Sequence, residues 1–224
     1  MFIINTPQFG AGRRLVLMVR LAFILLASLG LQAADLAVTM RQVEQRYNKA
    51  QTLTAEFEQR NLIHGTARRV ETGTLVLRKP GRMRWDYSAP EGKFFMCDGK
   101  DVYFYSPAAN RVERSRLKDS DDFRAPMAFL LGKLDFKKEF SDLSLREENG
   151  QSVLTALPKS SQLPYSKVEF TVNADSGIVK LVITNQDQTV TELIFRNERL
   201  NVPLRDDNFR FAKPGGAELV EVEQ

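Results

Sequence analysis

The sequence predicts a mainly β protein, built as a long and strongly curved antiparallel sheet with two short helical segments. Apolar and polar residues alternate with a period of two over most of the chain, which is typical of strands with one buried face. Asp98-Gly99 and Asn149-Gly150 each separate two such runs, and these dipeptides favour tight β-hairpin turns. Connections this short require antiparallel neighbours, and a sheet with many strands tends to curl towards closure.

The strands are predicted where the alternation is clearest. In each of these segments one set of side chains is apolar and the intervening set is mostly polar, so one face of the sheet is expected to be buried. The segments are residues 55–60, 75–78, 83–87, 168–172, 179–183 and 193–195.

Two segments have helical character. Leu36, Met40, Val43 and Tyr47 recur every three or four residues, which predicts a helix from about Leu36 to Gln51 with one apolar stripe. The segment 125–133 contains PMAFLLG and is apolar on nearly every side, which indicates a second, buried helix. Both helical segments are expected on the concave side of the sheet.

The N-terminus has the pattern of a secretory signal peptide. Three arginines precede an apolar run of about eleven residues, 21–31, which is shorter than the roughly 20 residues of a membrane-spanning helix. Small residues follow at Ala33 and Ala34, so we expect residues 1–33 to be cleaved and residues 34–224 to form a single exported domain. Loss of the three arginines lowers the formal net charge from +4 to about +1, which argues against nucleic acid as a partner.

The residues that usually carry catalysis are scarce. The chain has one histidine, His64 in a polar turn-like segment, and one cysteine, Cys97 beside an Asp-Gly turn, so no intramolecular disulfide can form. Metal ligation or acid–base chemistry would ordinarily show more such residues. We therefore expect no metal, no cofactor and no enzymatic activity, although a nucleophilic role for Cys97 remains an alternative.

Several motifs in order resemble the outer-membrane lipoprotein carrier (LolA-type) family. LTAEFEQRN is followed by GTLVLRKPGRMRWDYSAPEGKFFMCDGKDVYFYSP, then by APMAFLLG, and more loosely by LPK and VEFTVNADSGIVKLVITNQ. The most specific part is the pattern of Lys79, Pro80, Met83 and Trp85, joined to the DGK turn and the aromatic strand at 103–105. Together these motifs cover essentially the whole exported chain.

This resemblance implies an unclosed half-barrel with a helical lid over an apolar cavity, located in the periplasm and acting as a monomer. Such a protein takes the acyl chains of lipoproteins from an inner-membrane lipoprotein-releasing ABC transporter and delivers them to an outer-membrane lipoprotein acceptor. In the family a basic residue before a proline, usually arginine, holds the lid closed through hydrogen bonds to lid backbone. The matching residue here is Lys79, and Arg78 next to it is the other candidate for this latch.

The inward positions of the predicted strands are the candidates for lining the cavity. They are Phe57, Leu75, Leu77, Met83, Trp85, Met96, Tyr103, Tyr105, Phe170, Val172, Leu181 and Phe195, with Met127, Phe129, Leu130 and Leu131 from the lid.

Each of these signals also has a plainer interpretation. Apolar stripes on strands usually form a packed core, the helix at 125–133 could plug a filled barrel, and Lys79 could lie at a solvated strand end. A glycolipid or other lipid carrier of the same fold, or a lipid-sensing regulatory domain, is the alternative function.

Overall fold

The computed structural model describes residues 35–117, 133–161 and 163–222. The predicted signal peptide and the predicted lid residues Met127, Phe129, Leu130 and Leu131 lie outside these ranges. Among the described residues, no helix combines the length and apolar character needed to cross a bilayer.

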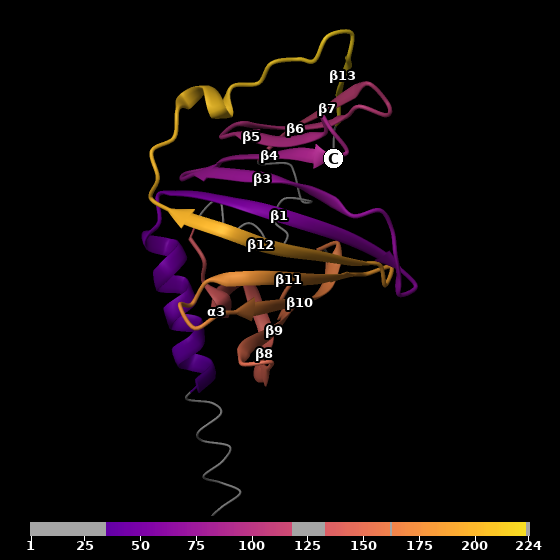
Figure 1. Ribbon diagram of the computed structural model, residues 1–224. Coiled ribbons are helices and arrows are strands. Elements are labelled where there is room, and N and C mark those ends of the chain that lie inside the picture. The colour runs from indigo at the N-terminus through magenta and orange to yellow at the C-terminus, as the bar shows by residue number, and fades with distance from the viewer. Residues whose placement is uncertain (1–34, 118–132, 162, 223–224) are drawn as a thin grey trace, which may run out of the picture.

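The described chain forms one curled sheet of thirteen strands, accompanied by a few short helical segments (Figure 1). The strands of the first half are β1 (Thr52–Ile63), β2 (Thr66–Ala67), β3 (Glu71–Arg78), β4 (Arg82–Ala89), β5 (Phe94–Asp98), β6 (Asp101–Ser106) and β7 (Arg111–Arg116). After the helix α3 (Phe136–Glu139) follow β8 (Phe140–Glu148), β9 (Gln151–Pro158), β10 (Tyr165–Val172), β11 (Ile178–Asn185) and β12 (Val190–Leu200). The 3-10 helix η2 (Asp206–Phe209) and β13 (Glu218–Glu221) end the described chain.

The strand order brings the two halves of the chain together at the middle of the sheet. The order is β13-β7-β6-β5-β4-β3-β1-β12-β11-β10-β9-β8, with β2 paired to β1 off this path. β1 and β12 form the long central pair, and the sheet curls back from them on both sides (Figure 1). The predicted fold class, a curved and unclosed antiparallel sheet, is confirmed, except that β13 pairs with β7 in parallel.

The predicted turn chemistry holds where glycine is required. Asn149 and Gly150, between β8 and β9, have φ angles of 52° and 74°, as a tight hairpin turn with two left-handed residues needs. Gly99, between β5 and β6, has φ of 100°.

The predicted N-terminal helix spans residues 35–49 and leads directly into β1. Its apolar stripe buries Met40, Val43 and Tyr47 against the inward side chains of the sheet. The helix lies at the end of the sheet where β1 begins (Figure 1). It is therefore anchored by side chains rather than by the sheet's backbone ladder.

Candidate functional site

The inward side chains of the curled sheet form one large apolar cluster, here named the inner cluster. Backbone pairing places Leu53, Leu77 and Met83 side by side on neighbouring strands, and the same pairing continues to Cys97 on β5. The strands β10, β11 and β12 supply the other half. The inner cluster therefore runs across both halves of the sheet and under the N-terminal helix. These halves are here called its arms: β1 with β3 to β7 forms one arm, and β8 to β12 form the other.

Nine of the predicted cavity residues lie in this cluster. Eight are buried, and Phe195 is partly buried against the others. The eight are Phe57, Leu75, Leu77, Met83, Trp85, Phe170, Val172 and Leu181.

The other three predicted residues are Met96, Tyr103 and Tyr105, and they lie on the opposite face of the sheet. The prediction that they line the concave side, here called the hollow, is therefore wrong. Met96 pairs with Arg84, which is an outward position, and Tyr103 pairs with Met96. These three belong to a second cluster, here named the outer cluster, which is completed by Phe94, Phe211, Val112 and Ala217. The physical reason is that the C-terminal segment covers this outer face, which makes β5 and β6 apolar on both sides.

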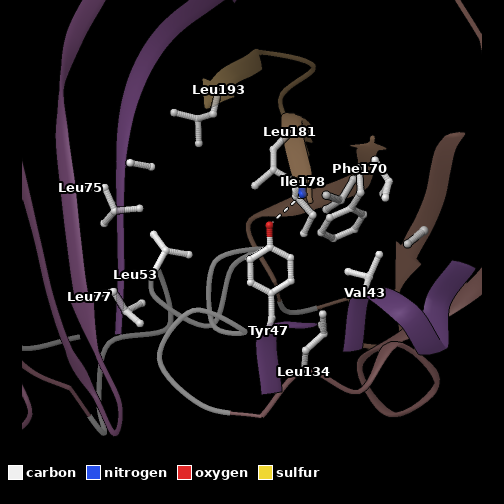
Figure 2. Packing of buried hydrophobic residues seen from close by; sticks show 14 of the residues in the cluster. Val43, Tyr47, Leu53, Leu75, Leu77, Leu134, Phe170, Ile178, Leu181 and Leu193 are labelled. Atoms are coloured by element: carbon white, nitrogen blue, oxygen red, sulfur yellow. Dashed lines mark hydrogen bonds between the residues drawn. The ribbon is translucent and has the colours of Figure 1, made fainter. Parts of the chain in front are cut away.

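Tyr47 of the N-terminal helix occupies the centre of the inner cluster (Figure 2). Its hydroxyl donates to Glu198 Oε2 at 2.8 Å and accepts from the backbone N–H of Ile178 at 2.7 Å. Arg46, next to Tyr47, donates from Nη2 to Glu198 Oε1 at 2.6 Å. Burial and the neighbouring charge of Glu198 raise the pKa of Tyr47, so its hydroxyl stays protonated and donating.

The space beside Tyr47 is small. A cavity of about 10 Å³ is lined by Leu53, Ala55, Leu75, Ile178 and Phe195, with Tyr47 and Glu198. This volume holds about one water molecule. In the described part of the molecule, the Tyr47 side chain therefore leaves little free space between these residues.

Lys79 and Arg78 hold different elements. Lys79 Nζ donates to the carbonyl oxygen of Tyr47 at 2.7 Å, so it binds the last turn of the N-terminal helix. Half-burial lowers the pKa of Lys79. Arg78 instead donates to Leu204 O and to the carboxylate of Asp206, and its guanidinium lies over the Phe209 ring at 5.4 Å. Arg78 thus fastens the C-terminal segment, while Lys79 reaches helix backbone.

The opposite end of the hollow is polar. Tyr87 Oη donates to Gln59 Oε1 at 3.1 Å, and the Lys93 ammonium pairs with Glu71 at 2.7 Å, both side chains being 15% exposed. The same ammonium lies 4.1 Å from the centre of the Tyr87 ring. Burial and the charge of Glu71 raise the pKa of Tyr87. The hollow therefore changes from apolar at the helix end to polar at the far end of β1 and β3.

The residues that sequence reasoning considered for catalysis are not assembled into a site. Cys97 is buried beside the Gly81 carbonyl, which its thiol reaches at 2.9 Å, and burial raises its pKa to about 11. His64 is exposed in the turn between β1 and β2. Among the described residues no group of three or more His, Cys, Asp or Glu side chains is arranged to hold a metal ion.

The sequence does not predict Glu198 as a candidate functional residue. Glu198 receives hydrogen bonds from Tyr47 and Arg46, although about 150 residues separate them in the chain. The local pattern around Glu198 is that of an ordinary charged strand residue, so no signal in the sequence singles it out.

Residues 48–212 match the model of the outer membrane lipoprotein carrier protein LolA family. The chain belongs to this family. Membership confirms the resemblance found in the sequence and makes the chain a periplasmic carrier with lipoproteins as its class of cargo.

Individual relatives agree with the family assignment. An outer-membrane lipoprotein carrier protein of Nitrosomonas europaea is 27% identical over 205 residues, covering 91% of this chain and 99% of the relative. The protein of the same name from Cupriavidus necator is 26% identical over 200 residues, covering 88% and 94%. The crystal structure of a LolA superfamily protein from Nitrosomonas europaea aligns over 78% of this chain and 97% of that chain, with 11% identity and a TM-score of 0.44.

Proposed function

We propose that this protein carries lipoproteins by enclosing their acyl chains on the concave face of its curled sheet. It receives them from an inner-membrane lipoprotein-releasing ABC transporter and passes them to an outer-membrane acceptor. It works as a monomer, after removal of residues 1–33, and by binding alone without a catalytic step. The observation that carries the proposal is the inner cluster, which is continuous across both arms of the sheet and is covered by a helix held by a few polar contacts.

The energetics of the cargo explain why such a surface is needed. A sixteen-carbon acyl chain gains about 12 kcal/mol on leaving water, at about 0.8 kcal/mol for each CH₂ group. A carrier must offer an apolar surface of similar quality and still release the chain. A hollow that is filled by its own helix when empty meets both needs, because part of the gain is spent on displacing that helix.

The contacts of Tyr47 and Lys79 define what must be displaced. Tyr47 is bonded to Glu198 and Ile178 on one arm of the sheet, and its carbonyl is bonded by Lys79 at the end of the other arm. Withdrawing Tyr47 would open the small cavity and expose Leu53, Leu75 and Phe195 to an incoming chain. We therefore assign to Lys79, and not to Arg78, a latch role on the N-terminal helix. Residues 125–132 of the predicted lid, which the family's basic residue would hold, lie outside the described residues.

The test is a release assay with a matched pair of variants on neighbouring residues. Inner-membrane vesicles containing the transporter and a radiolabelled lipoprotein receive ATP and the purified carrier, and soluble one-to-one complexes are measured by gel filtration. Phe195→Asn places a polar group on the inward face, and Ile194→Asn places the same group on the outward face of β12. We expect Phe195→Asn to lose most of the complex and Ile194→Asn to retain it.

Circular dichroism of both variants shows whether the sheet is intact. A folded Phe195→Asn protein that takes up as much lipoprotein as the parent would contradict acyl binding in the hollow. A parent protein that forms no lipoprotein complex, while its extract contains a glycolipid, would replace the cargo assignment.

A further inference from the structure

The inner cluster contains one buried polar atom that lacks a partner. Trp85 is 2% exposed, and its indole Nε1–H has no hydrogen-bond acceptor among the described residues. A buried donor without an acceptor is destabilising by about 1–3 kcal/mol, so it is rare in native proteins and calls for an explanation. A phenylalanine would fill such an apolar position without this penalty.

Trp85 stands where the apolar and polar parts of the hollow meet. Its ring packs edge-on against Phe57 with centroids 4.7 Å apart, and it also contacts Phe195, with centroids 6.1 Å apart. Its cross-strand partner is Leu75, which lines the small cavity beside Tyr47 together with Phe195. Two residues further along β4 is the inward Tyr87, which is bonded to Gln59 at the polar end.

An acyl ester has the polarity profile of this hollow. Its hydrocarbon chain is apolar, its carbonyl oxygen accepts one or two hydrogen bonds, and the glycerol beyond the carbonyl is polar. With the chain directed towards Leu77 and Tyr47, the carbonyl lies level with Trp85 and the glycerol lies level with Gln59 and Tyr87.

We propose that Trp85 Nε1–H donates a hydrogen bond to the ester carbonyl of a bound acyl chain, which selects acyl esters and fixes the direction in which the cargo enters. This inference rests on the proposed carrier function and deepens it. In the bound complex, the lipid-modified end of the lipoprotein chain then projects out of the hollow at its polar end, beside the Lys93–Glu71 pair. The indole N–H, which has no acceptor among the described residues, would gain one from the bound ester.

The test compares two lipopeptides of equal chain length, one with diacyl glycerol esters and one with dialkyl glycerol ethers that lack carbonyl groups. Loss of one neutral hydrogen bond should weaken binding by about threefold to tenfold. We expect the parent protein to prefer the ester by this factor and Trp85→Phe to bind both with equal affinity. A Trp85→Phe protein that keeps the parent's ester preference would overturn the inference.

A second measurement needs no variant. Trp85 is the only tryptophan in the chain, so a ¹⁵N-labelled protein gives one indole N–H signal. We expect the ester lipopeptide to shift this signal downfield and the ether lipopeptide to leave it near its original position. Equal shifts with the two ligands would overturn the proposed hydrogen bond.

The orientation is tested through the fluorescence of the same residue. Acyl chains brominated close to the carbonyl should quench Trp85 more strongly than chains brominated at the methyl end, and the reverse order would overturn the proposed direction. Phosphatidylglycerol and its ether analogue, measured in parallel, show whether Trp85 recognises esters of lipoproteins alone or of phospholipids as well. If the parent binds neither the ester nor the ether lipopeptide, the carrier function itself is wrong, whereas equal binding of both refutes only the role of Trp85.

Discussion

Replacing Lys79 by methionine removes the hydrogen bond to the N-terminal helix that we propose as its latch. Methionine keeps the length of the side chain but cannot donate to the Tyr47 carbonyl, which Lys79 Nζ reaches at 2.7 Å. A hydrogen bond from a charged donor contributes about 1.5–3 kcal/mol, and relief of the half-buried charge, which lowers the pKa of Lys79, offsets part of that loss. We expect a net destabilisation of the closed helix by about 1 kcal/mol, or about fivefold in its closed-to-open ratio.

Hydrogen exchange and lipid association measure this change directly. In Lys79→Met, the amides of residues 43–49 should exchange about fivefold faster, and a fluorescent acyl probe should associate about fivefold faster, because the open form is more populated. Transfer of bound lipoprotein to the acceptor should be slower than in the parent, because the helix competes less well for the hollow.

Arg78→Met is the matched control, because the side-chain hydrogen bonds of Arg78 to other described residues go to Leu204 and Asp206 in the C-terminal segment. It should leave helix exchange unchanged and speed exchange around Leu204 and Phe209 instead. If Lys79→Met leaves the helix amides and the association rate at parental values, or if Arg78→Met changes them equally, Lys79 is not the latch.

Three further predictions follow from burial and charge. Phe170→Ala should lower the free energy of unfolding by about 3–5 kcal/mol in urea titrations, because this fully buried ring packs edge-on against Phe136 with ring centroids 5.2 Å apart. A loss below about 1 kcal/mol would contradict the place of Phe170 in the core. Cys97 should react with maleimide at pH 8 about a hundredfold more slowly than an exposed thiol, because burial raises its pKa from 9.0 to about 11. A reaction rate equal to that of the urea-unfolded chain would disprove this. Hydrogen bonds from Arg60 and Arg196 lower the pKa of Glu58, so the ionised Glu58 stabilises the fold above its ordinary pKa of 4.5 and this contribution is lost as the pH falls below that value. Glu58→Gln should therefore make the free energy of unfolding less sensitive to acid. An acid titration of unfolding that is the same in variant and parent would refute the effect.

The alternation of the sequence predicts the central strands well for a simple reason. On β1, β3 and β4 one face meets the inner cluster and the other meets water, so only one assignment of Phe57, Leu75 or Trp85 buries the apolar residues.

The same rule fails on β5 and β6 because both faces are covered. Tyr103 stacks on Phe211 with ring centroids 4.1 Å apart, while Cys97 on the other face belongs to the inner cluster. A strand that is apolar on both sides carries no periodic signal of which side is the hollow. The covering segment lies about a hundred residues further along the chain, and no local pattern in β5 or β6 refers to it.

The proposed latch residue shows the same difference between local and long-range information. The pattern around Lys79 and Pro80 marks the position, but choosing between Lys79 and Arg78 requires knowing what lies on each side of the end of β3. Arg78 meets Asp206 and Phe209, and Lys79 meets the helix that carries Tyr47. These partners are brought together only by the pairing of β1 with β3 and β12.

The N-terminal helix bridges the two arms of the sheet, and in the proposed mechanism one set of contacts therefore serves both loading and release. Tyr47 is bonded to β11 and Glu198 on one arm, and Lys79 at the end of β3 on the other arm is bonded to the Tyr47 carbonyl. Each of these bonds contributes about 1 kcal/mol, to which the burial of the helix stripe adds several more, so closure is comparable with, but smaller than, the roughly 12 kcal/mol that one acyl chain gains. In the proposed mechanism, an acyl chain that would otherwise face water gains more than closure of the helix costs, and the closing helix would return part of that energy when an acceptor removes the cargo.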